Sequence, residues 1–309
     1  MRSVLRTSPL CFVAMVVLAA PVRGSEPPAE EPVHLRIGYS ARTFFDVGIT
    51  DARAATRVSA DALIRRAGLL GTSEVVIPED LDALEETAKL GQIDILTLTI
   101  SEYVQMADKI PLTPALTAVR GEDYREHYVL IAHRDHGAAE LQDFRGTRLM
   151  TAADLGGSVP IVWLNALLLR NGLPRSNHFF GQVTSARKTI RAVLPVFFRQ
   201  ADLCLVPRTI LETVSELNPQ IGRELRLVAV SPGFSYGVVC FSDGLPRELR
   251  DTIREALLNM HVNPEGQQLL TLFYVDQLIP YEPSHLKSVL DLFEEYERLR
   301  KEPAGGGAE

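Results

Sequence analysis

The chain has 309 residues, of which 46% are hydrophobic and 23% are charged, and its formal net charge is −7 at pH 7. This composition is typical of globular proteins with a large core, and it excludes the disordered, collagen-like and disulfide-rich classes. At roughly 100 to 200 residues per domain, the length suggests two domains. An acidic chain has no overall positive field to hold a phosphate backbone, so we do not expect nucleic acid as a partner.

The N-terminal segment has the pattern of a secretory signal peptide. Arg2 and Arg6 precede an apolar run at about 10–20, and the small residue Gly24 follows. The run is about half of the ~20 residues that a membrane-spanning helix needs, so we predict cleavage after Gly24 rather than a membrane anchor. Residues 1–24 contain three arginines and no acid, so cleavage changes the formal charge from −7 to −10. The predicted location is the periplasm or the outside of the cell.

Two cysteines remain after the predicted cleavage, in an oxidising compartment where a pair could form a disulfide. Cys204 lies in the apolar run ADLCLV and Cys240 in the run YGVVCF. A buried free thiol is the ordinary state of a cysteine in such a strand-like run. We favour two free thiols, because the fold predicted below places these residues in different lobes.

The first part of the mature chain alternates strands with helices. The pattern predicts strands at 33–39, 74–77 and 93–98 and helices at about 52–68, 78–91 and 101–108. Strands and helices that alternate with short connections are typical of an α/β fold with a largely parallel sheet covered on both faces.

A second α/β unit follows, and the pattern then changes. We predict strands at 127–133, 148–152, 177–183, 201–206 and 225–231, with helices between them, one of which Pro195 must kink or end early. Beyond residue 231 the pattern predicts one strand and helices at 246–260, 264–274 and 283–300, each with a proline at or near its first position. The predicted lobes are 33–123 with 235–300, and 124–234; residues 301–309 are predicted to be a disordered tail.

Several short stretches of this sequence, taken in order, are similar to stretches of a known protein family. They include IGYS, LGQIDILTLTISEYVQMAD, YVLIAHRD followed by LQDFRGTRL, QADLCLVPRTIL and LRLVAVSPGFSYGVVCFSDGLP, and they run from about residue 34 to 300. In order and spacing they resemble the periplasmic solute-binding proteins of phosphate/phosphonate-type ABC transporters, which have the type II periplasmic binding fold. The resemblance implies two lobes, each a mostly parallel sheet flanked by helices. It also implies crossovers near 121–126 and 231–236 and a hinge that closes on a ligand.

The sequence departs from that family at the loop expected to hold the ligand. Phosphonate binders carry a Ser-Thr-Ser-Gly-Tyr-like loop at the start of a second-lobe helix. The corresponding stretch here, GGSVPIVW, keeps Ser158 but has Val159 and Pro160 where hydrogen-bond donors are expected. A histidine that usually follows the next strand is replaced by the stretch GQVT at 181–184. The resemblance therefore implies the fold but leaves the ligand open, and lost or relocated ligand binding is an alternative.

Candidate ligand-binding residues lie at the junctions between strands and helices. Ligands of α/β sheets collect at the carboxyl ends of strands, and helix N-termini there offer free N–H donors to anions. The alternative is that the hydroxyls cap their own helices. In the first lobe the candidates are Tyr39, Ser40, Thr97, Thr99, Ser101 and Tyr103, and in the second Gly156, Gly157, Ser158, Thr184, Ser185, Arg187, Arg208 and Thr209.

Basic residues add to this set. Arg187, Lys188 and Arg191 cluster at a predicted helix start, an unfavourable end for cations, and a guanidinium there could hold a carboxylate or phosphoryl group. A solvated basic face explains the cluster equally well. Arg208 directly follows a strand end, where it either contacts the ligand or forms a structural salt bridge.

Aromatic residues could line an apolar part of the cleft. Phe44 and Phe45 lie in an otherwise polar loop, so cleft contact is a reasonable expectation for them. Trp163 lies one turn into a predicted helix, where packing in the core is favoured over the cleft.

No catalytic signature is present. The sequence has no GxSxG, HExxH, GxxxxGK[ST] or GxGxxG pattern, and His127, His133 and His136 have no partners at metal-site spacing. Asp46, Asp94 and Asp202 have no partner visible in the sequence. We therefore expect no catalytic residues, no cofactor and no metal.

The function predicted is that of a monomeric periplasmic protein that captures a small polar or anionic ligand, such as a phosphonate, by hinge closure and delivers it to an ABC permease. One alternative is a ligand-sensing module that docks on a membrane sensor kinase. Another is an enzyme on the same bilobal fold.

Overall fold

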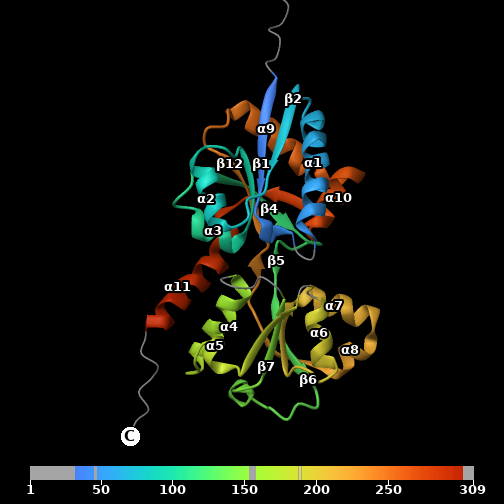
Figure 1. Cartoon of the computed structure of the whole chain (residues 1–309), viewed down its shortest axis with the longest axis vertical. Coiled ribbons are helices and arrows are strands. Elements are labelled where there is room, and N and C mark those ends of the chain that lie inside the picture. Colours follow the sequence, from blue (N-terminus) through green and yellow to red (C-terminus); the bar gives the residue numbers. More distant parts are fainter. Residues whose placement is uncertain (1–31, 45–46, 153–157, 187, 189, 302–309) are drawn as a thin grey trace, which may run out of the picture. The chain divides into compact units, whose positions relative to one another are not determined.

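The computed structural model describes residues 32–44, 47–152, 158–186, 188 and 190–301. The predicted signal peptide at 1–24 and most of the predicted tail lie outside the described residues. The described residues form a 6-stranded sheet, a 5-stranded sheet and a short 2-stranded sheet, with helices packed around the two larger ones (Figure 1). We call the part built on the 6-stranded sheet lobe 1 and the part built on the 5-stranded sheet lobe 2.

Lobe 1 contains strands from both ends of the chain. In sheet order they pair as β13-β4-β12-β3-β1-β2. The strands are β1 (Val33–Tyr39), β2 (Gly71–Val76), β3 (Ile95–Thr99), β4 (Leu112–Val119), β12 (Gly237–Ser242) and β13 (Gln277–Pro280). Strand β1 pairs with β2 and β3 in parallel, whereas β12 is antiparallel to both β3 and β4, and β13 is antiparallel to β4. The sheet is therefore mixed, and not mostly parallel as predicted, because the strands from the C-terminal part of the chain and β4 pair in antiparallel.

The helices of lobe 1 begin and end at the signals that the sequence carries. Asp80 caps a helix by accepting from the backbone N–H of Ala83 at 2.8 Å, and Gly68 and Gly91 follow helix ends with φ of 68° and 65°. The helices are α1 (Ile49–Arg66), α2 (Leu81–Lys89), α3 (Ile100–Met106), α9 (Arg247–Leu258), α10 (Pro264–Leu272) and α11 (Lys287–Lys301), with short 3-10 turns η1 (Ala41–Thr43), η3 (Met260–Val262) and η4 (Pro283–Leu286).

Lobe 2 has the sheet order β10-β6-β9-β7-β8. Its strands are β6 (Tyr128–His133), β7 (Arg148–Ala152), β8 (Gln182–Ala186), β9 (Leu203–Pro207) and β10 (Leu225–Val230). Strand β7 pairs in parallel with β8 and β9, whereas β6 is antiparallel to β9 and β10. The helices are η2 (Leu141–Phe144), α4 (Val159–Arg170), α5 (Ser176–Phe179), α6 (Ile190–Phe197), α7 (Arg208–Leu217) and α8 (Pro219–Glu224).

The two segments expected as crossovers pair with each other. Strand β5 (Arg125–Glu126) is antiparallel to β11 (Phe234–Ser235), and Phe234 lies opposite Glu126. The chain runs from one larger sheet to the other twice, and each time it passes through one strand of this short pair. The exact lobe boundaries at 123/124 and 234/235 stay a prediction.

The core consists of three buried clusters. One lies on a single face of the lobe 1 sheet beneath α1, α9 and α10, and another lies in lobe 2 against α6. The remaining cluster contains residues of both lobes, including Leu98, Trp163 and Leu292, and α11 packs against α4 (Figure 1). Trp163 is only 2% exposed, so the prediction that it packs in the core is confirmed.

Several elements differ from the sequence prediction. Strands β4 and β13 were not expected, because a proline lies inside one and ends the other. Pro114 is accommodated where the β12–β4 register shifts, which is where a sheet tolerates a missing N–H. The strand predicted at 177–183 agrees with the structure only at 182–183, where β8 begins. Residues 176–179 instead form α5, whose first N–H donates to the buried side chain of Asn165 at 2.8 Å.

Both described cysteines are buried and free. Cys204 lies on β9 of lobe 2 and Cys240 on β12 of lobe 1, and burial raises the pKa of both thiols. The placement in different lobes agrees with the expectation from the sequence.

Candidate ligand-binding site

The lobe 1 candidates gather where β1 and β3 end. Parallel pairing places Tyr39 beside Thr97, and the backbone N–H of Ser40 donates to the Thr97 carbonyl at 3.0 Å. Thr99 ends β3 and caps α3, whose first turn carries Ser101 and, two residues later, Tyr103. The parallel register is therefore what brings residues some sixty positions apart to one edge of the sheet.

A buried carboxylate that sequence reasoning missed lies at the centre of this group. Glu102 is 2% exposed and accepts hydrogen bonds from the hydroxyls of Ser40, at 2.5 Å, and Thr99, at 2.7 Å. The backbone N–H of Thr99 donates to it at 3.1 Å, and Arg42 Nε lies 4.0 Å from it. The Thr-x-x-Glu spacing of a capping box was the signal that could have found it.

This network limits what the hydroxyls can do. A hydroxyl has one proton to donate, and Ser40 and Thr99 both donate theirs to Glu102. These two side chains can accept a hydrogen bond from a ligand, but they have no proton left for an anion. Thr99 does cap its own helix, and ligand contact by Thr99 stays a prediction.

The aromatic candidates of lobe 1 pack inside the lobe. The rings of Tyr39 and Phe273 stack with centroids 5.6 Å apart and an interplanar angle of 17°. Phe44 packs against both rings, at 5.7 Å and 5.2 Å. Both Tyr39 and Phe44 are buried, and burial raises the pKa of the Tyr39 hydroxyl. Phe45 and Asp46 lie outside the described residues.

A cavity of about 90 Å³ adjoins these residues. It lies between the lobe 1 sheet and helices α1, α9 and α10, and Tyr39, Thr97 and Thr99 are part of its lining. Most of the other lining side chains are aliphatic or aromatic.

The lobe 2 candidates are only partly described. Ser158 is the N-cap residue of α4, in an extended conformation with φ −82° and ψ 160°. The hydroxyls of Ser185 and Thr151 lie 3.0 Å apart across the β7–β8 pair, and Thr184 is exposed. Gly156, Gly157 and Arg187 lie outside the described residues. Ligand contact by this group stays a prediction.

Arg208 opens α7 and forms a local ion pair. Its Nε donates to Glu212 Oε1 at 2.8 Å, and its side chain is 51% exposed. The structural salt bridge considered from the sequence is therefore present. Lys188 and Arg191 are exposed.

A polar network at the crossovers joins the two lobes, and its central residues were missed by sequence reasoning. Glu126 on β5 is 5% exposed and accepts from the hydroxyl of Thr209 at 2.7 Å and from the backbone N–H of His127 at 3.0 Å. Arg120, beyond the end of β4, donates to the same Thr209 hydroxyl at 3.1 Å. Tyr236, beside β11, lies close enough to Glu126 for the carboxylate to raise the pKa of its hydroxyl. The network thus links lobe 1, both crossovers and the first turn of α7.

Burial dominates the electrostatics of this network. It raises the pKa of the Glu126 carboxyl above its usual range, against the opposing hydrogen bond from Thr209. Burial, and then the nearby Glu126 carboxylate, raise the pKa of the Tyr236 hydroxyl.

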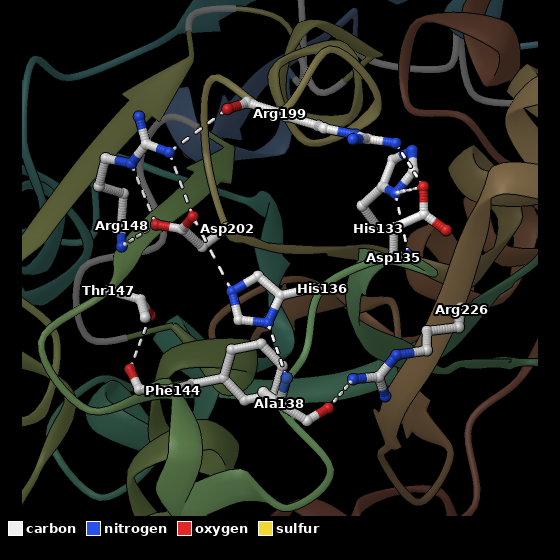
Figure 2. A network of polar contacts seen from close by, with 10 residues as sticks. All are labelled: His133, Asp135, His136, Ala138, Phe144, Thr147, Arg148, Arg199, Asp202 and Arg226. Atoms are coloured by element: carbon white, nitrogen blue, oxygen red, sulfur yellow. Dashed lines mark hydrogen bonds and ion pairs between the residues drawn. The ribbon is translucent and has the colours of Figure 1, made fainter.

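A second polar network lies at the far end of lobe 2 from the crossovers (Figure 2). Arg148 donates to Asp202 through its backbone N–H and two guanidinium nitrogens, which lowers the pKa of Asp202. The His136 ring points toward Asp202, with Nε2 4.0 Å from Oδ1, and stacks on Phe144 at 4.8 Å. Asp202, which had no partner visible in the sequence, is thus held in a structural ion pair.

The comparison with solved structures identifies the fold. A Xanthomonas citri protein bound to ATP matches with a TM-score of 0.64 and 16% identity over 86% of this chain and 98% of that one. A binding protein component of a Pseudomonas aeruginosa ABC phosphonate transporter matches with a TM-score of 0.64 and 14% identity, over 87% and 88% of the two chains. PhnD1 from Prochlorococcus marinus, in complex with methylphosphonate, matches with a TM-score of 0.62 and 12% identity, over 86% and 98%. The chain therefore has the two-lobed α/β fold of periplasmic binding proteins.

The sequence profile of one family spans both lobes. The family described as "ABC transporter, phosphonate, periplasmic substrate-binding protein" matches residues 45–286. The chain belongs to this family, and the predicted resemblance is confirmed. A comparison with curated protein sequences finds no match. Among the residues that the structure describes, no helix has the length and apolar character needed to cross a membrane.

Proposed function

We propose that the protein captures a small solute with a phosphonate or related oxyanion group in the periplasm and delivers it to the permease of an ABC transporter. The observation that carries this proposal is the family match at 45–286, which spans both lobes and both crossovers. Two of the similar structures described above contain ATP and methylphosphonate, respectively, and both ligands carry oxygens on phosphorus. The proposal includes no catalytic step, and the working form is a monomer.

The first turn of α4 is suited to bind an oxyanion near Ser158. The first N–H groups of a helix have no partner inside it, and the helix dipole favours negative charge there. Pro160 removes one of these donors, whereas Val159 and Ile161 keep theirs. Lobe 1 is suited to a different part of the ligand, because Glu102 has taken the protons of Ser40 and Thr99. We therefore assign the oxyanion to lobe 2.

Closure on the ligand would turn about the paired crossovers β5 and β11. Arg120 and Thr209 come from different lobes, and their hydrogen bond lies beside this pair. A rotation of one lobe would therefore change the polar network around Glu126. The packing of α11 on α4 would set how far the lobes separate.

Titration calorimetry tests the proposal. The protein is exported, purified from the periplasm and titrated with methylphosphonate, phosphate and sulfate. We expect one-to-one binding of at least one phosphorus oxyanion, and sequencing of the purified protein should begin at Ser25. The Ser158→Ala variant should bind more weakly, whereas Ser284→Ala, at an exposed position on η4, should bind as the wild type does. If none of the three anions gives a measurable heat of binding, the proposed ligand class is rejected.

A further inference from the structure

The cavity of lobe 1 is large enough to hold part of a small molecule. Its volume is about 90 Å³, whereas a single water needs roughly 10 to 15 Å³ of such space. It lies inside one lobe, so its walls do not depend on closure. The sheet forms one wall, and Leu63 of α1, Leu257 of α9 and Leu270 of α10 form the other.

The lining of the cavity is mostly apolar and therefore favours a hydrocarbon group over water. Apart from a few hydroxyls, the side chains around the cavity carry no polar atoms, and an apolar cavity of this kind stays dry. Atoms that face an empty space lose their dispersion partners, so an apolar group that enters restores those contacts. The cavity exists because small side chains, Ala60 on α1 and Ala118 on β4, stand where larger ones would fill it.

One end of the cavity reaches the candidate site. The hydroxyl residues among its lining include Thr43, Thr97, Thr99 and Tyr236. Thr97 and Thr99 belong to the carboxyl end of β3, and Tyr236 takes part in the crossover network. The cavity therefore runs from the polar edge of lobe 1 into its apolar interior.

We propose that this cavity is a subsite for an apolar substituent of the ligand, a short alkyl or aryl group attached to the oxyanion. The inference rests on the proposed function, because the oxyanion is the one assigned there. It names the substrate class more closely: an amphiphilic phosphonate rather than a fully polar one.

A series of straight-chain alkylphosphonates, from methyl to hexyl, tests the subsite by titration calorimetry. Burying one methylene is worth enough to lower the dissociation constant about fourfold, so we expect that factor for each added methylene until the cavity is full. Ala118→Leu should abolish this chain-length dependence and leave methylphosphonate affinity unchanged. Ala115→Leu, the same change on the same strand outside the cavity lining, should retain it.

The outcomes separate the two proposals. If all phosphonates bind with the same affinity, the subsite is rejected while the proposed function stands. If no phosphonate binds, the proposed ligand class fails, and 1-hexanol is then titrated into the wild-type protein while methyl NMR signals are followed. Shifts confined to Leu63, Leu257 and Leu270 would retain an apolar site in lobe 1. Unshifted signals from these residues would reject the apolar site. This experiment uses only the wild-type protein, so its result does not depend on whether a variant folds.

Discussion

Arg36 and Asp94 form the same set of hydrogen bonds in lobe 1 that Arg148 and Asp202 form in lobe 2. The backbone N–H, Nε and Nη2 of Arg36 donate to the Asp94 carboxylate at 2.8, 3.0 and 2.7 Å, and the Asp94 N–H donates to the Arg36 carbonyl at 2.8 Å. The corresponding distances for Arg148 and Asp202 are 2.8, 3.0, 3.1 and 3.0 Å. Each arginine lies on a strand, and each aspartate directly precedes the neighbouring parallel strand. The lobes thus share a structural device although the sequence shows no repeat.

Removing the Asp202 charge should cost stability in a pH-dependent way. The hydrogen bonds from Arg148 lower the pKa of Asp202 in the folded state below its unfolded value, which is about 3.9. The stabilisation is therefore present above the unfolded pKa and is lost as the pH falls through the folded pKa. We expect Asp202→Asn to lower the free energy of unfolding by about 1 to 3 kcal/mol at pH 7 and by less at pH 3, measured by urea unfolding.

The control for this experiment is Asp251→Asn. Asp251 pairs with Arg247 at 3.8 Å on an exposed helix face, so its loss should cost about 1 kcal/mol or less. A loss at Asp202 that is equal at pH 7 and pH 3 would contradict the assigned role.

Neutralising Glu126 should have the opposite pH dependence. Burial raises the folded pKa of Glu126 above its unfolded value, so its contribution is most favourable below the unfolded pKa and is lost as the pH rises through the folded pKa. Glu126→Gln keeps an oxygen to accept from Thr209 and removes the buried charge. Thermal unfolding between pH 4 and pH 8 should show the variant gaining stability relative to the wild type as the pH rises. A difference that does not change with pH would show that the carboxyl titrates as an ordinary exposed one.

Removing Arg208 should reveal whether it contacts ligand. Its ion pair with Glu212 is exposed, and such pairs contribute about 0.2 to 1 kcal/mol, so Arg208→Ala should leave the melting temperature of the unliganded protein within a few degrees. If Ser158 and Arg208 hold the oxyanion, the double variant with both changed to alanine should lose ligand-induced stabilisation. Arg247→Ala breaks a comparable exposed pair and should retain it. An unchanged response of the double variant would remove both residues from the site.

The two buried cysteines should be free but unreactive in the native protein. Burial raises the pKa of both thiols, and the thiolate is the reactive form. A thiol reagent should therefore react slowly with the native protein and should titrate Cys204 and Cys240 once the protein is denatured without reductant. Absence of reaction after denaturation would mean that the two form a disulfide.

Local signals explain why much of the fold could be predicted. Asp80 and Gly91 bound α2, and the alternation of apolar residues in 33–39 marks β1, because each of these features acts within a few residues of chain. Strand β4 was missed because Pro114 interrupts its pattern, and only the neighbouring β12 shows that the register shifts to accommodate it.

The site was harder to predict, because its partners are distant in sequence. Thr99 could be recognised as a cap, but its shared partner Glu102 becomes a site residue only once β1 brings Ser40 beside it. Glu126 and Thr209 are 83 positions apart, and nothing local distinguishes that glutamate from an exposed one. Burial and pairing of this kind depend on the finished fold.

The most direct measurement of the central claim is a thermal-shift screen of the purified protein. The panel contains alkylphosphonates, phosphate, sulfonates, amino acids and thiamine precursors, each at high concentration. A ligand at 100 times its dissociation constant adds about 2.7 kcal/mol to the free energy of unfolding, which shifts the melting temperature measurably. We predict a clear shift with phosphonates, larger for longer alkyl substituents than for methyl, and none with amino acids. A melting temperature that no phosphorus oxyanion changes would contradict the account.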